Sequence, residues 1–100
     1  MSLDKDGYPT KPGLKKIKAW DVIRDPYGLA EFIEDNWWMA GWGYRLHGRK
    51  LELHTGGWSG NEETISVLQR TFFWTFYWVS SRRGGHYYFE LPKKAAARSK

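Results

Sequence analysis

The segment from Phe72 to Phe89 constrains the fold of this chain more than any other feature, because nine of its eighteen residues are aromatic. The aromatic residues form two blocks, 72–78 and 87–89, with polar residues and two glycines between them. Each buried aromatic side chain removes about 150–250 Å² from water, which at roughly 25 cal/mol per Å² is a large share of a small core. The sequence therefore predicts an aromatic β-hairpin at the centre of the fold.

The segment from 72 to 81 allows two readings, a strand or a continuation of the helix that precedes it. Aromatic and β-branched residues favour the strand, and a turn signal at 82–85 followed by a second aromatic block favours a hairpin. Both faces of that strand are aromatic, so we expect it inside the sheet rather than at an edge.

The remaining elements follow from periodicity and turn signals. Asp25 and Pro26 predict the start of a helix over 26–36, whose apolar residues recur at helical spacing. Alternating residues over 42–54 with a turn at 47–49 predict a first hairpin. Ser59 and Glu62 fit a capping box for a helix over 61–70. The chain is thus expected to be α+β, with two helices packed on one face of a four-stranded, mainly antiparallel sheet, in the order α-β-β-α-β-β.

Length, cysteine content and hydropathy exclude several classes of protein. One hundred residues make one domain, and the absence of cysteine excludes disulfides, thiolate zinc sites and cysteine nucleophiles. No apolar run approaches the roughly 18–20 residues that span a bilayer, and the first residues lack the apolar stretch of a secretion signal. We expect a cytoplasmic protein without a membrane partner.

The net charge of +5 is unevenly distributed along the chain. Residues 1–18 carry five Lys against two Asp, and residues 92–100 carry four basic residues and no acidic one. Residues 19–91 carry seven basic and nine acidic residues, a net charge of −2. We therefore expect a flexible basic N-terminal arm (1–18), a single domain (19–91) and a flexible basic C-terminal tail (92–100). A slightly acidic domain argues against a surface for duplex DNA.

Arginines at the two hairpin turns are the leading candidates for ligand contacts. Two guanidinium groups on a glycine turn beside tyrosines can hold a phosphate and stack a base. If the two turns lie at the same end of the sheet, they form a basic rim. If the strands joined by the second helix run parallel, the turns lie at opposite ends and no rim forms. The candidate ligand-binding residues are Arg82, Arg83, His86, Arg49, Arg45 and Tyr87.

Catalytic and cofactor sites are less well supported by the sequence. His54 with Glu52, or His86 with Glu90, would share a strand face, but no spacing matches a metal-ligand signature. The glycine-rich segment 56–60 lacks the pattern of a phosphate-binding loop and is better explained as a structural loop. We expect no metal, no cofactor and no enzymatic activity.

The segments 54–63 (HTGGWSGNEE) and 81–90 (SRRGGHYYFE) resemble a family of small proteins encoded by bacteriophages and prophages. The resemblance covers roughly residues 40–91. It implies expression in the cytoplasm of a bacterial host, and it brings no established activity or site with it. Small accessory phage proteins commonly bind host proteins, nucleic acids or nucleotides, so the resemblance favours binding over catalysis.

Two functions therefore compete. The first is a non-enzymatic binding module for an anionic ligand, either single-stranded nucleic acid or a nucleotide. The second is a protein interaction module, such as an inhibitor of a host factor or a homodimer, because seven tryptophans are difficult to bury in a domain of this size.

Overall fold

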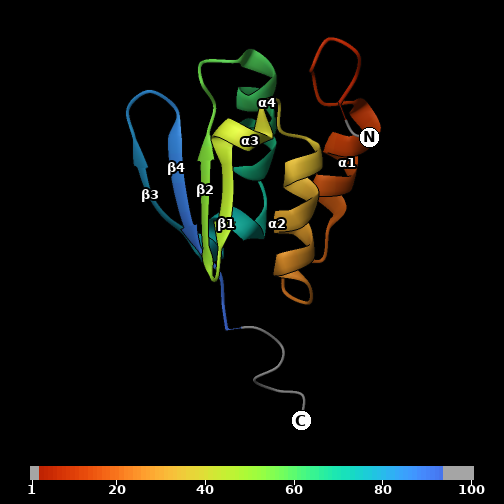
Figure 1. The fold of residues 1–100 in the computed structure, drawn as a ribbon. Helices are drawn as coiled ribbons and strands as arrows, with labels where there is room; N and C mark the ends of the chain where they lie inside the picture. Colours follow the sequence, from red (N-terminus) through yellow and green to blue (C-terminus); the bar gives the residue numbers. More distant parts are fainter. Residues whose placement is uncertain (1–2, 94–100) are drawn as a thin grey trace.

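The computed structural model describes residues 3–93, in which a layer of helices packs against one four-stranded sheet (Figure 1). Each neighbouring pair of strands is antiparallel, and the strand order is β1-β2-β4-β3. The predicted α+β class and four-stranded antiparallel sheet are thus confirmed. The elements are α1 (Lys11–Ala19), α2 (Pro26–Asp35), α3 (Ala40–Gly43), β1 (Tyr44–His47), β2 (Lys50–His54), α4 (Ser59–Leu68), α5 (Phe72–Tyr77), β3 (Trp78–Arg82) and β4 (His86–Glu90).

The register of the strands gives the sheet one apolar and one polar face, because successive side chains of a strand point to opposite sides. Leu46, Leu51 and Phe89 are cross-strand neighbours on the apolar face. We call the other side the open face. Its cross-strand rows are Arg45–Glu52–Tyr88–Ser80 and His54–His86–Arg82.

The core lies between the apolar face and the helices. Figure 1 shows α1, α2 and α4 together on one side of the sheet. Each helix of this layer and the short helix α5 contribute fully or almost fully buried side chains, and β2 and β4 contribute theirs from the sheet. These core residues include Ile17, Leu29, Ile33, Leu51, Leu53, Ile65, Leu68, Phe73 and Phe89.

The N-terminal region contains a helix that the sequence analysis missed. Residues 1–18 were expected to form a flexible arm, but α1 occupies residues 11–19, so this expectation is wrong for residues 11–18. The Thr10 hydroxyl caps the helix by accepting the Gly13 N–H at 3.1 Å, and Pro12 suits the first turn. Ile17 is completely buried in the core. Four of the five lysines of this segment therefore lie on a packed helix.

The predicted strand over 72–81 is wrong in its first half, because residues 72–77 form the helix α5. The ring of Phe73 is fully buried and lies 5.4 Å from the ring of Phe89. Trp74 packs edge-on against the rings of Phe89 and Tyr87, at 5.3 and 5.6 Å. A helical turn lets both side chains reach the apolar face of β4 together, and this packing outweighs the strand propensity of the segment.

The strand β3 lies at the edge of the sheet, so its predicted position inside the sheet is also wrong. All five of its residues are exposed. A bulge between Trp78 and Ser80 interrupts its register with β4. Irregularity of this kind is common at sheet edges, where it reduces pairing with other chains.

The segment 54–63 is a structural junction. The fully buried Asn61 side chain accepts the Trp38 N–H at 2.8 Å and donates to the Trp38 carbonyl oxygen at 3.1 Å. The Trp58 indole donates to the Gly7 carbonyl oxygen at 3.0 Å and stacks on Trp38. These hydrogen bonds connect the N-terminal segment and the loop after α2 to the start of α4.

The predicted capping box is wrong, because α4 begins at Ser59 and no side chain caps it. The hydroxyl of Ser59 lies instead 3.0 Å from the Tyr8 hydroxyl. Glu62 accepts a long hydrogen bond, at 3.4 Å, from the hydroxyl of Thr55.

Most of the predicted C-terminal tail, residues 94–100, lies outside the described residues. Pro92 follows β4, and its carbonyl oxygen accepts a hydrogen bond from the Tyr27 hydroxyl at 2.8 Å. Across residues 3–93, no helix has the length and apolar character needed to cross a membrane.

Candidate functional site

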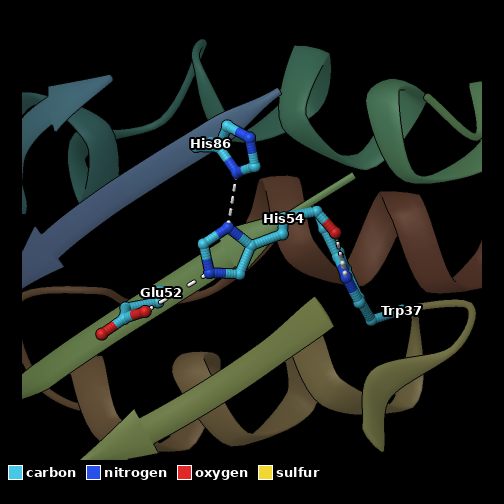
Figure 2. A network of polar contacts seen from close by, with 4 residues as sticks. All are labelled: Trp37, Glu52, His54 and His86. Atoms are coloured by element: carbon cyan, nitrogen blue, oxygen red, sulfur yellow. Dashed lines mark hydrogen bonds and ion pairs between the residues drawn. The ribbon is translucent and has the colours of Figure 1, made fainter. Parts of the chain in front are cut away.

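A chain of three side chains runs across the two central strands on the open face. His54 Nδ1 lies 2.7 Å from His86 Nδ1, and His54 Nε2 lies 3.3 Å from Glu52 Oε1 (Figure 2). The side chains of His54 and Glu52 are 20% and 35% exposed. The three residues come together because 52 and 54 alternate onto one face of β2 and His86 is the cross-strand partner of His54.

The backbone around the two histidines is held from several sides. The Trp37 indole donates to the His54 carbonyl oxygen at 3.2 Å (Figure 2). The Thr55 N–H donates to the Gly85 carbonyl oxygen at 2.9 Å, which extends the contact of β2 and β4 beyond the last paired residues. The ends of the two strands that carry the histidines are therefore fixed relative to each other.

Aromatic rings flank this chain. Tyr88 lies edge-on to the His54 ring at 5.9 Å, and Trp42 lies edge-on to it at 6.3 Å. Trp42 is 62% exposed and comes from α3, where the sequence had predicted the beginning of a strand. A depression of about 280 Å³ adjoins Tyr88, and its lining includes Lys50, Glu52, Val79 and Glu90.

The two hairpin turns lie at opposite ends of the sheet, as Figure 1 shows, so the second alternative of the sequence analysis holds and no basic rim forms. The crossover through α4 and α5 makes β2 and β3 parallel, with β4 between them. Arg49 lies in the first turn, where its Nε donates to the Leu91 carbonyl oxygen at 2.9 Å and its Nη2 lies 3.5 Å from Glu90 Oε2. Arg49 is thus engaged far from the histidines.

The other predicted residues divide between the two faces. Arg82 is the cross-strand partner of His86 on the open face, and Arg83 begins the turn beside it. Arg45 shares the open face but lies on β1, three strand spacings or about 14 Å from β3. Tyr87 lies on the apolar face, where its ring packs against Trp74. We define the open-face site as Trp42, Glu52, His54, Arg82, His86 and Tyr88.

The sequence contained a signal for several of these residues. Alternation along β4 places 86 and 88 on one face and 87 on the other, which would have selected Tyr88 instead of Tyr87. The same alternation links Glu52 to His54, but pairing of the two hairpins was needed to bring His54 to His86. Nothing in the local sequence indicated the helical turn that carries Trp42.

Arg82 of the site and the neighbouring Arg83 are available for a ligand. Within residues 3–93, neither Arg82 nor Arg83 forms an ion pair with a carboxylate. No group of three or more His, Asp or Glu side chains in this part of the chain is placed to hold a metal ion. The two tyrosines with a raised pKa lie outside the open-face site. Burial, followed by the charges of three α2 carboxylates, raises the pKa of Tyr44, and burial raises the pKa of Tyr77.

A second exposed surface, which we call the aromatic edge, lies on α5 and β3. Phe72 and Phe76 stack on each other with their ring centres 5.7 Å apart. These two side chains and those of Trp78 and Val79 are 43–63% exposed.

Comparisons with known proteins identify no relative of this chain. No protein-family model, no curated protein and no solved structure matches it.

Proposed function

We propose that this protein is a binding module that holds single-stranded nucleic acid or a nucleotide on its open face. The observation that carries the proposal is the row of His54, His86 and Arg82 beside the ring of Tyr88. A four-stranded antiparallel sheet with helices on one side leaves its other side available to unstacked bases. Single-stranded nucleic acids are bound by basic groups along the backbone together with aromatic rings that stack on bases.

The spacing of the side chains suits one nucleotide. Residues 86 and 88 of β4 are two positions apart, which is about 6.8 Å along an extended strand. A base in the depression next to Tyr88 would therefore leave its sugar and phosphate over His86 and Arg82. Glu52 and Glu90 line the depression, so it favours the uncharged base over the phosphate.

Oligonucleotide binding by single variants tests this proposal. Arg82→Ala should weaken binding and lower the slope of log affinity against log salt by about 0.7–1, because one phosphate contact is lost. Tyr88→Leu should weaken binding by about 1–3 kcal/mol, the contribution of stacking on one base. Fluorescence anisotropy of a labelled single strand of about 12 nucleotides measures both effects.

Two variants serve as controls for the loss of positive charge. Arg24→Ala removes an exposed arginine in the segment before α2, and Arg70→Ala removes an exposed arginine just after α4. If either control weakens binding as much as Arg82→Ala, attraction is non-specific and the open-face site is refuted. Binding that is indifferent to salt would refute it as well.

The second candidate function is association of two copies of this chain through the aromatic edge. The stacked and exposed Phe72 and Phe76 favour it. Large exposed apolar patches mark interaction surfaces, and aromatic residues are enriched among the residues that contribute most to binding. It predicts a mass that doubles with concentration in light scattering and is insensitive to salt, and Phe76→Ser should abolish the doubling. A monomer at every concentration would exclude the homodimer.

A further inference from the structure

The hydrogen positions in the chain of Glu52, His54 and His86 follow from the chemistry of its first member. An ionised carboxylate only accepts hydrogen bonds, so the contact at 3.3 Å places a proton on His54 Nε2. When both imidazoles are neutral, each carries one proton, and His54 Nδ1 is then a bare acceptor. Because it lies 2.7 Å from His86 Nδ1, the proton between the two rings belongs to His86.

This arrangement of protons leaves His86 Nε2 as a hydrogen-bond acceptor at the end of the three-residue series that is farthest from Glu52. In the neutral ring, the single proton is already used on Nδ1. A methyl group added at Gly84 would lie 3.4 Å from Nε2, which shows that this atom faces the β3–β4 turn. Arg82, the cross-strand partner of His86, brings a guanidinium group to the same part of the open face.

The site therefore combines an atom that only accepts with a group that only donates. Arg82 matches a phosphate, which offers only acceptors when fully ionised. His86 Nε2 requires a hydroxyl or N–H donor close to that phosphate. In a nucleotide strand the ribose 2′-hydroxyl is the donor next to the backbone phosphate, and it distinguishes RNA from DNA.

We infer that His86 is a specificity-determining residue that accepts a hydrogen bond from the ribose 2′-hydroxyl, and that the open-face site is selective for single-stranded RNA. The inference rests on the proposed function, because it assumes that a nucleotide strand lies on the open face. Glu52 and His54 are positioning residues, since they fix the proton on His86 Nδ1 and do not themselves contact the sugar.

The test compares three oligonucleotides of one sequence: RNA, DNA with deoxyuridine in place of thymidine, and RNA with 2′-O-methyl groups. One hydrogen bond to an accessible group changes affinity by about three- to tenfold. We expect the wild-type protein to bind RNA more tightly than DNA by that factor. The 2′-O-methyl strand, which keeps the sugar oxygen but lacks the proton, should bind like DNA. This comparison needs no variant of the protein.

Two variants then examine the residues. His86→Phe keeps a planar ring without an acceptor, so the ratio of RNA to DNA affinity should fall to about 1. Glu52→Gln allows the amide to donate to His54 Nε2 and so to reverse the proton order. It should therefore lower the ratio of RNA to DNA affinity. Loss of one negative charge alone would change both affinities equally and leave this ratio unchanged.

The outcomes separate this inference from the proposed function. Equal affinity for RNA and DNA, or a preference that survives 2′-O-methylation or His86→Phe, overturns the selectivity and leaves the binding module intact. A preference for particular bases that is the same in RNA and DNA also overturns it, because a base N–H would then be the donor. Absence of binding to every strand overturns both proposals.

Discussion

Replacing Gly85 with alanine should destabilise the protein more than any other single glycine-to-alanine change in the two hairpins. Gly85 has a φ of +84°, and a Cβ atom there would lie against the Thr55 hydroxyl oxygen. The left-handed backbone costs an alanine about 1–2 kcal/mol, and forcing the neighbouring side chain aside adds about 1–3 kcal/mol. The free energy of unfolding should therefore fall by about 2–5 kcal/mol in urea denaturation followed by tryptophan fluorescence.

Gly57→Ala is the matched control, because its φ of +77° imposes similar strain and nothing lies within 4 Å of the added methyl group. It should lower the free energy of unfolding by the backbone contribution alone, about 1–2 kcal/mol. In the background of Thr55→Ala the hydroxyl is gone, so the extra cost of Gly85→Ala should shrink by about 1 kcal/mol or more. If the two glycine variants lost the same free energy of unfolding, the close approach of the β3–β4 turn to Thr55 would be refuted.

Two further predictions concern the helix α5 and Tyr44 of β1. Phe73→Ala should lower the free energy of unfolding by about 3–5 kcal/mol and Phe72→Ala by less than about 1 kcal/mol, because only Phe73 is buried; similar losses would contradict the helix α5. The pKa of Tyr44 is raised above 10.0, chiefly by burial, so its stabilisation is complete below about pH 10 and is lost at higher pH. Denaturation between about pH 8 and pH 11 should show a steeper loss for wild type than for Tyr44→Phe, and parallel curves would contradict this.

The turns and the alternating strands could be predicted from the sequence because their signals are local. Glycines at 48, 84 and 85 adopt positive φ in the two hairpin turns, and the alternating Leu51 and Leu53 face the core. The helix α2 begins at Pro26 as predicted, where the Asp25 carboxylate accepts the Gly28 N–H at 2.9 Å. These features depend on a few adjacent residues.

The helix α5 and the site could not be predicted in the same way, because both depend on contacts distant in sequence. The aromatic residues of 72–77 have the propensities of a strand, and packing of Phe73 and Trp74 against β4 favours the helix. The contact between His54 and His86 spans 32 residues and exists because β4 inserts beside β2. The phage-family resemblance, the cytoplasmic location and the absence of enzymatic activity stay predictions.

The position of β4 has a consequence for how the molecule assembles. This strand is the last regular element among residues 3–93, yet it lies between β2 and β3. A ribosome releases the N-terminal elements first, so the first hairpin and the helices can gather while β3 still lacks its partner. Closure of the sheet then awaits residues 86–90, which bring the two histidines together in the same step. A nascent chain stopped before residue 86 would contain the residues of α1 to α5 and still lack the site.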